Sequence, residues 1–147
     1  MGCDIHAHLE VKIGGEWHYF SPVEMWQSYT TFAKMANVRN WDEGPTPISK
    51  PKGLPQDISF MTKYHSDNYG VDGHPHSWLG YDELIELLEF FESEDLEKPW
   101  GSHHEDDLKW ADFGVWLFGN PISGFKKYPG DYPADLEDVR MVFWFDN

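Results

Sequence analysis

The chain has 147 residues, of which 26 are acidic and 11 basic, so its formal net charge is −15. This length suits one domain with a substantial core, and an aromatic content of 17% argues against intrinsic disorder despite the acidity. The excess of acidic residues argues against the basic patch that direct nucleic-acid binding needs. The sequence has no apolar run near the ~20 residues that cross a membrane. Cys3 is the only cysteine, so it cannot form a disulfide within the chain.

The first predicted element is a β-strand over residues 3–13, in which apolar and polar residues alternate. A period of two places successive side chains on opposite faces of a sheet. The buried face would carry Cys3, Ile5, Ala7, Leu9, Val11 and Ile13. The other face begins with a carboxylate and two imidazoles in a row, Asp4, His6 and His8, and this row is the first candidate site.

Gly14 and Gly15 predict a tight hairpin turn into a second strand over residues 16–20. A helix-start pattern follows from Ser21 to Glu24, because serine can cap a helix, proline suits its first position and the glutamate completes a capping box. The pattern predicts a helix that reaches about residue 37, with a break near Ser28.

Residues 38–80 are rich in proline and glycine and are predicted to form a long ordered loop. We expect this loop to cover the polar face of the first strand. The clearest helix follows over residues 81–93, where the apolar stripe consists of Leu84, Leu87, Leu88 and Phe91. Residues 94–107 are predicted to be an exposed acidic stretch, and residues 108–118 fit either a helix or a buried strand.

The chain closes with an apolar strand over residues 139–147, which we expect to pair beside the first strand. These elements predict one α+β domain over residues 1–147. Its small, mainly antiparallel sheet would have the N-terminal hairpin and the C-terminal strand near its centre, with two or three helices packed on it. Asp146 would join the cluster of Asp4 and His6 if the two strands are neighbours.

Asp4 and His6 form the centre of a predicted metal site, to which His74 would add a third ligand. Imidazole and carboxylate suit a divalent metal ion, with zinc or manganese favoured. A solvated strand face whose histidines bind nothing is the alternative. The run at residues 103–107 also has the composition of a metal site, but an exposed acidic stretch explains it more simply.

Residues 72–78 place an aspartate, two histidines, a serine and a tryptophan directly before the predicted helix. Asp72 and His76 are candidate catalytic residues, because imidazole titrates near neutral pH and can transfer protons. Ser77 and Trp78 are candidate substrate contacts. The alternative is a structured turn in which polar side chains bond local backbone groups.

Basic residues are scarce, so those that gather in two segments supply a candidate site for an anionic small molecule. Arg39 and Asn40 lie in one segment and Lys52 in the next. A surface patch that merely neutralises acidic neighbours is the alternative.

Together these motifs resemble a family of small uncharacterised proteins from bacteria and their phages. The resemblance rests on Met-Gly-Cys-Asp-Ile-His at residues 1–6, on segments at residues 38–40, 52–59 and 73–79, and on Val-Phe-Trp-Phe-Asp-Asn at residues 142–147. Lys52 stands where the family pattern has arginine, Pro75 where it has serine, and His8 at a variable position. The resemblance implies a phage–host setting and points to residues, but to no reaction.

Three functional hypotheses follow. The first is a metal-dependent hydrolase of a phosphoester or nucleotide-like small molecule, in which the ion activates water, Arg39 and Lys52 neutralise phosphate and His76 protonates the leaving group. The second is a non-catalytic protein that sequesters a nucleotide-like ligand between aromatic side chains such as Trp78. The third is an acidic protein that occupies a basic host partner. All three predict a cytoplasmic protein, in the host cytoplasm if a phage encodes it, that does not act at a membrane.

Overall fold

The computed structural model describes residues 2–23, 25, 27–41, 44–92 and 136–146. Within these residues, one antiparallel sheet has the strand order β2-β1-β4-β3. Its strands are β1 (Asp4–Ile13), β2 (Glu16–Val23), β3 (Gly73–Gly80) and β4 (Leu136–Asp146). The helices are α1 (Tyr29–Ala36), α2 (Phe60–Asp67) and α3 (Tyr81–Glu92), with a 3₁₀ turn, η1 (Gly70–Asp72), before β3. The predicted α+β fold is confirmed.

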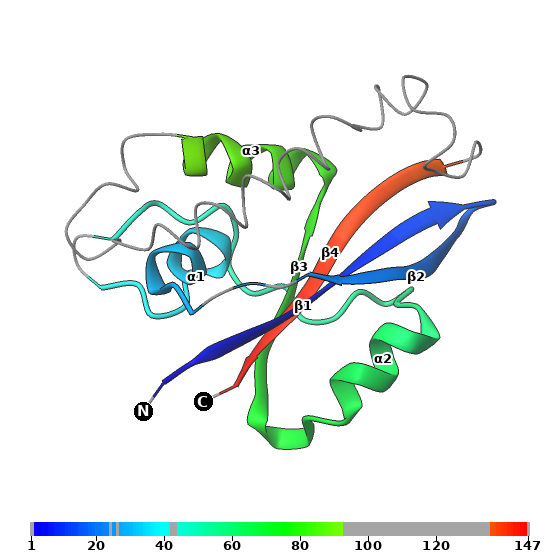
Figure 1. The fold of residues 1–147 in the computed structure, drawn as a ribbon, viewed down its shortest axis with the longest axis horizontal. Coiled ribbons are helices and arrows are strands. Elements are labelled where there is room, and N and C mark those ends of the chain that lie inside the picture. The colour runs from blue at the N-terminus through cyan, green and yellow to red at the C-terminus, as the bar shows by residue number, and fades with distance from the viewer. Residues whose placement is uncertain (1, 24, 26, 42–43, 93–135, 147) are drawn as a thin grey trace.

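The two ends of the chain form the centre of the sheet. β1 pairs with β4 from Asp4 opposite Asp146 to Ile13 opposite Leu136, so both termini lie at the same edge of the molecule (Figure 1). Residues 139–145 of β4 are all buried, and their β-branched and aromatic side chains suit a central strand. The predicted pairing of the first and last strands is therefore confirmed.

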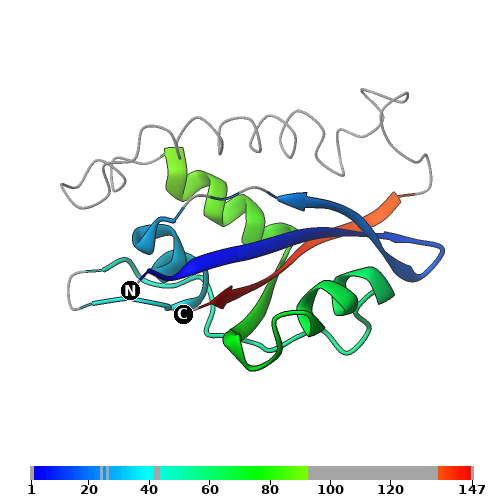
Figure 2. The same cartoon turned by 60° about the horizontal axis from the view of Figure 1, so that its bottom comes forward.

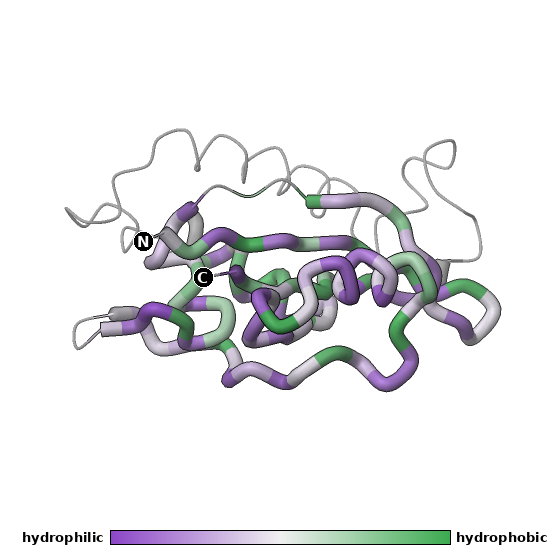
Figure 3. The backbone as a smooth tube through the Cα atoms, turned by 90° about the horizontal axis from the view of Figure 1, so that it is seen from below, coloured by the Kyte–Doolittle hydropathy of each residue, from purple (hydrophilic) through white to green (hydrophobic). Residues whose placement is uncertain are grey.

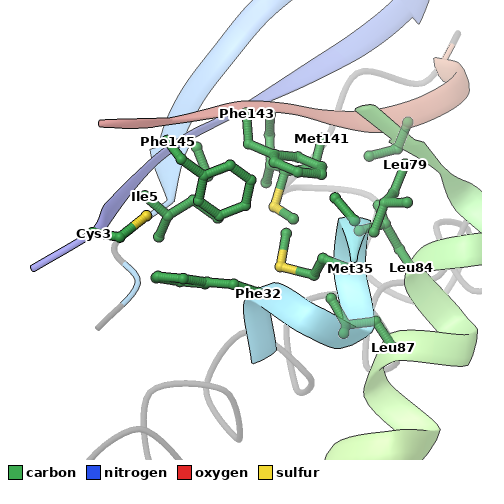
Figure 4. Close-up of a cluster of buried hydrophobic side chains, with 14 of the residues drawn as sticks. Cys3, Ile5, Phe32, Met35, Leu79, Leu84, Leu87, Met141, Phe143 and Phe145 are labelled. Carbon is green, nitrogen blue, oxygen red and sulfur yellow. The ribbon is translucent and has the colours of Figure 1, made fainter. Parts of the chain in front are cut away.

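The hydrophobic core lies on the apolar face of β1 that the alternation predicts. Helices α1 and α3 cover this face, and their side chains meet those of β4 beneath the sheet (Figure 4). Phe32 of α1, for example, contacts the edge of Phe145 at a centroid distance of 5.0 Å. Burying one such aromatic side chain contributes about 1.5–3 kcal/mol to folding.

The opposite, polar face of the sheet is covered by α2, on the other side from α1 and α3 (Figures 1 and 2). Seen from below, α2 lies in front of the sheet, and the tube of β1 alternates between purple and green (Figure 3). The buried residues of α2 are polar, Thr62 and Ser66. Its outward side carries three large side chains, Phe60, Met61 and Tyr64, exposed by 81%, 43% and 54%, beside the exposed ion pair of Lys63 and Asp67. Helix α2 is therefore held by polar contacts and not by an apolar stripe.

The predicted helix start at residue 21 is wrong. Ser21 and Pro22 belong to β2, where they pair with Leu9 and His8. Proline is tolerated there because β2 is an edge strand, which needs no further ladder donor on its open side. The helix begins at Tyr29, after Ser28, whose side chain caps it by accepting a hydrogen bond from the backbone of Thr31 at 3.4 Å. The predicted break at Ser28 is thus the true start.

The middle of the chain is more regular than the predicted loop. Residues 38–80 contain α2, which Ser59 caps, and β3, which pairs with β4. The strand β3 leads directly into α3, so the motif at residues 72–78 lies mostly on a strand and not on a turn. The predictions for residues 94–107 and 108–118 lie outside the described residues. Among the described helices, each is too short or too polar to span a membrane.

Candidate functional site

The candidate site lies on the polar face of the sheet, where His6 stands between an acid and a phenol. His6 Nε2 lies 2.5 Å from Asp146 Oδ2 on the neighbouring strand β4. His6 Nδ1 lies 2.9 Å from the hydroxyl of Tyr69, which follows α2. We call these three side chains the acid–base chain. Its members come from opposite ends and from the middle of the sequence.

The partners of His6 determine which of its ring nitrogens carries the proton. An ionised carboxylate can only accept, so Nε2–H donates to Asp146. Nδ1 then holds the lone pair that accepts the hydrogen bond from Tyr69 O–H. The carboxylate thereby fixes both the orientation and the tautomer of the imidazole, and it would stabilise an imidazolium if the phenol gave up its proton.

The acid–base chain is partly open to solvent, with side-chain exposures of 25% for His6 and 31% for Asp146. Burial, followed by the negative charge of Asp146, raises the pKa of Tyr69 above its usual value. The phenol is therefore protonated at neutral pH and needs the adjacent imidazole as a base before it can lose its proton. A partly exposed, pre-oriented pair of proton donor and acceptor is typical of acid–base sites.

An aromatic cluster around Trp144 supports the acid–base chain. The buried indole of Trp144 lies at centroid distances of 6.3 Å from His6, 5.8 Å from Tyr69 and 5.9 Å from His76. His76 in turn contacts Ser66 Oγ through Nε2 at 3.0 Å. Burial lowers the pKa of His76, so this imidazole is neutral at physiological pH and suited to hydrogen bonding.

Gly73 at the start of β3 allows Tyr69 to approach the sheet. A Cβ atom at this position would lie 2.8 Å from Tyr69 Cβ and 3.1 Å from Trp144 Cδ1. We expect Gly73→Ala to cost about 1–3 kcal/mol of unfolding free energy and to displace Tyr69, because the added methyl overpacks the contact. Urea unfolding measures the loss. Gly80→Ala is the matched control, since its Cβ would meet atoms at 3.7 Å or more, and equal losses in both variants would contradict the close contact.

The same aromatic cluster continues along this face to His8, whose ring stacks on Trp144 at a centroid distance of 5.1 Å. His8 stacks on His65 of α2 at 4.8 Å and 11° between ring planes, and its Nδ1 lies 3.1 Å from the Tyr19 hydroxyl. Burial, then the neighbouring His65 and His6, lower the pKa of His8 to about 4. Between about pH 4 and pH ~6.5, His8 is thus neutral in the folded protein although an unfolded chain would be protonated there.

This shift predicts how stability depends on pH. The unfolded chain takes up a proton at His8 below pH ~6.5, whereas the folded chain resists it until pH falls to about 4. Stability should therefore fall as pH is lowered across this window, by about 2–3 kcal/mol from this residue, and change no further below it. Urea unfolding at several pH values should show that lowering the pH reduces the free energy of unfolding less in His8→Asn than in the parent protein. His18→Asn, a control at an exposed histidine, should behave like the parent. Equal slopes in all three would contradict the shift.

A buried ion-pair network attaches α2 to the sheet. The carboxylate of Glu10 accepts hydrogen bonds from Arg140 Nε, Ser59 N and Thr62 Oγ1, each at 2.8 Å. Glu10 is fully buried and Arg140 nearly so, and the guanidinium also binds Asp57 at 2.7 Å. Because two of these bonds go to the N-terminal turn of α2, Glu10 fixes the helix whose far end leads to Tyr69.

With the geometry described, comparison with known proteins adds no assignment. No protein-family model, no curated protein and no solved structure matches the chain.

The structure does not gather the predicted metal ligands. Within the described ranges, no group of three or more histidine, cysteine, aspartate or glutamate side chains is arranged to hold an ion. Asp4 and His74 are exposed, and both nitrogens of His6 already bind Asp146 and Tyr69. An ion on His6 would have to replace one of these bonds. The described residues do not fit a three-ligand centre, so zinc or manganese stays a prediction from the sequence.

Of the other predicted residues, His76 lies near the acid–base chain, and the backbone N–H of Asp72 donates to the Tyr69 carbonyl at 3.1 Å. Asp72 is exposed in η1. Ser77 is buried and accepts a hydrogen bond from the Lys52 backbone at 3.1 Å. The Lys52 ammonium lies 3.9 Å from the Trp78 ring centroid and pairs with Glu83.

The proposed anion-binding residues in the segment after α1 also lie apart from His6. The Arg39 guanidinium lies over the ring of Tyr29 at 5.3 Å. The Asn40 amide donates to Asn37 Oδ1 and to the carbonyl of Pro45, at 2.8 and 3.0 Å. The predicted anion site therefore does not assemble around one point.

Sequence reasoning missed Tyr69 as a site residue. Tyr69 lies in a segment that was predicted to be a loop, and it carries no motif of its own. Ser59, which can cap a helix, is a local signal for the start of α2, but the position of Tyr69 depends on how α2 packs on the sheet. Asp146, by contrast, could be predicted from the sequence, because the pairing of the first and last strands places it near His6.

Proposed function

We propose that the protein is a hydrolase of a phosphoester or nucleotide-like small molecule, with Asp146, His6 and Tyr69 as its catalytic residues. The observation that carries the proposal is the acid–base chain: a carboxylate at 2.5 Å and a phenol at 2.9 Å on the two nitrogens of one imidazole. If His6 had only a structural role, this partly exposed side chain would not need a hydrogen bond on each of its two ring nitrogens.

The chemistry follows from the proton positions. Tyr69 would accept a proton from an attacking water molecule as its own proton passes to His6 Nδ1, and Asp146 would stabilise the imidazolium. The proton then returns through Tyr69 to the leaving oxygen, so water is added across the scissile bond without net change in the protein. Acid–base assistance of this kind contributes about 10²–10⁴-fold to a rate.

The surroundings support a nucleotide-like substrate over a highly charged one. The half-buried ring of Tyr69 suits packing against a planar base, and the fully buried Trp144 beneath it supports that ring. The net charge of −15 and the carboxylate of Asp146 repel polyanions. The predicted phosphate-neutralising residues Arg39 and Lys52 have other partners, so the proposal does not assign them to the reaction.

Turnover of a small substrate panel tests this proposal. The purified protein should hydrolyse at least one of bis(p-nitrophenyl) phosphate, nucleoside monophosphates and cyclic nucleotides, and His6→Asn should abolish the activity. His18→Asn, an exposed histidine on β2, is the matched control. Activity that persists in EDTA supports a metal-free reaction, and activity restored by zinc or manganese would favour the metal-dependent alternative. No turnover, or equal turnover in His6→Asn, would contradict the proposal.

A second candidate function is docking to a basic host protein through the outer side of α2. Its specific support is the exposed apolar set of Phe60, Met61 and Tyr64, because such patches are typical of interaction sites. Since the chain carries a charge of −15, the complementary partner is basic. Purified candidates from a host extract should bind more weakly at high salt and to Phe60→Ser/Met61→Ser, but equally well to Tyr69→Phe. Binding unaffected by the double substitution would contradict this function.

A further inference from the structure

Residues 54–69 leave the sheet and return to it at the same strand, β3. At one end, the Gly53 N–H donates to the His76 carbonyl of β3 at 2.9 Å. At the other end, the chain re-enters the sheet where β3 begins, at Gly73. These two attachments lie about 10 Å apart along the strand. We call residues 54–69, which contain α2 and end at Tyr69, the flap.

The flap buries little apolar surface. Of its residues, all of which the structure describes, none belongs to the hydrophobic core cluster. The side chains that it buries are three hydroxyls and one proline, on Ser59, Thr62, Ser66 and Pro55. Its phenylalanine, Phe60, is 81% exposed. Hydrophobic burial, the main favourable term in folding, therefore does little to hold the flap closed.

Hydrogen bonds hold the flap closed instead, together with ring contacts to the histidines of β1. The Ser59 N–H and the Thr62 hydroxyl both donate to Glu10 of β1 at 2.8 Å. Arg140, the cation that neutralises Glu10, belongs to β4 and stays beside it if the flap leaves. The guanidinium then loses only Asp57, its partner on the flap. Because water can replace the hydrogen bonds from the flap, opening leaves no buried charge without a partner.

A glycine with positive φ lies at each end of the flap. Gly53 has a φ of +79° and Gly70 a φ of +54°. No atom of the described residues lies within 4 Å of the place where a Cβ atom of either glycine would stand. Since glycine adopts positive and negative φ with similar ease, both positions can rotate without backbone strain or collision. Hinges at the two ends of a segment are typical of loops that open over a site.

We propose that the flap opens from the polar face of the sheet as one unit, by rotation at Gly53 and Gly70. Opening takes the Tyr69 hydroxyl away from His6 Nδ1 and uncovers the part of the sheet that α2 covers. A small molecule enters in the open state, and closure rebuilds the acid–base chain over it. This role as a gate rests on the proposed function, but the motion itself does not depend on hydrolysis.

Native-state amide hydrogen exchange of the full ¹⁵N-labelled chain tests the motion, with urea added below the unfolding transition. A helix as short as α2 is unstable by itself in water, so its amides exchange when the flap opens. The Ser59 amide, which donates to Glu10, should exchange with them at one common opening free energy, below that of global unfolding. The amides of β4 should exchange only by global unfolding, and the Gly53 amide, which is bound to β3, should not follow the flap.

Two results of this measurement would overturn the proposal. If the Ser59 and α2 amides exchange only at the free energy and urea dependence of the β4 amides, the flap does not open separately from the sheet. If each of them exchanges at its own free energy, the segment fluctuates residue by residue and does not open as one unit.

Gly70→Ala tests the hinge. Alanine is strained at a φ of +54°, and rotation on opening relieves this strain, so the flap amides should exchange about 5–30-fold faster than in the parent. Gly14→Ala is the matched control, because Gly14 has a φ of +61° and equal open space in the turn between β1 and β2. It should leave flap exchange unchanged. Equal acceleration in both variants, or none in Gly70→Ala, would contradict the hinge, and the parent measurement still decides if Gly70→Ala does not fold.

Hydrogen exchange and turnover together separate the flap from the chemistry. A parent protein whose flap amides share one opening but which hydrolyses nothing would refute the hydrolase and leave the flap intact. Turnover by a protein whose flap amides exchange only through global unfolding would refute the flap alone.

Discussion

Tyr69→Phe is expected to lower kcat by about 10²–10⁴-fold while leaving the fold intact, the range that acid–base catalysis usually contributes. The substitution removes one oxygen, which both donates to His6 at 2.9 Å and would exchange protons with the substrate. The ring remains, so its packing at 5.8 Å from Trp144 is kept. Steady-state kinetics on the best substrate of the panel measure the effect, and KM should change far less than kcat.

Tyr64→Phe is the matched control, because Tyr64 lies on the same stretch of chain but points outward from α2. Its hydroxyl should be dispensable for turnover. If both variants keep the parent kcat, or if both lower it equally while they stay folded, Tyr69 has no catalytic role.

Glu10→Ala is expected to lower the free energy of unfolding by about 3–5 kcal/mol, because it leaves the charge of Arg140 buried without its main partner. The carboxylate also accepts bonds from Ser59 and Thr62, so the first turn of α2 would lose its attachment to the sheet. The displaced helix would draw Tyr69 away from His6. Both stability and kcat should therefore fall, and chemical denaturation gives the first of these.

Glu16→Ala is the control for this substitution. Because Glu16 is exposed on β2, its replacement should lower the free energy of unfolding by less than about 0.5 kcal/mol. Amide hydrogen exchange adds a local readout: Glu10→Ala should expose the α2 amides more than those of α3. A loss of stability no larger than that of Glu16→Ala would show that the network does not hold the helix.

The centre of the sheet was predictable because its signal is local and periodic. Strict alternation along β1 identified the buried set from Cys3 to Val11, and the apolar C-terminal segment had the composition of a central strand. Once those two strands pair, Asp146 must stand near His6. This half of the acid–base chain therefore follows from the sequence.

The other half depends on tertiary contacts that no local pattern encodes. Helix α2 buries polar residues and exposes apolar ones, the reverse of an ordinary amphipathic stripe, since Glu10 and His8 are its neighbours on the sheet. A period-based prediction has no way to recognise such a helix. The helix start predicted at Ser21 and Pro22 is wrong for a similar reason. Their sequence has the pattern of a helix start, but these residues pair with β1 instead.

¹⁵N NMR of the His6 imidazole shows directly whether Asp146 and Tyr69 hold His6 in one tautomer. At neutral pH we expect a protonated Nε2, an Nδ1 without a proton, and an Nδ1 signal that moves when Tyr69 is replaced by phenylalanine. A proton on Nδ1 with Nε2 bare, or an Nδ1 signal that Tyr69→Phe leaves unchanged, would contradict the acid–base chain.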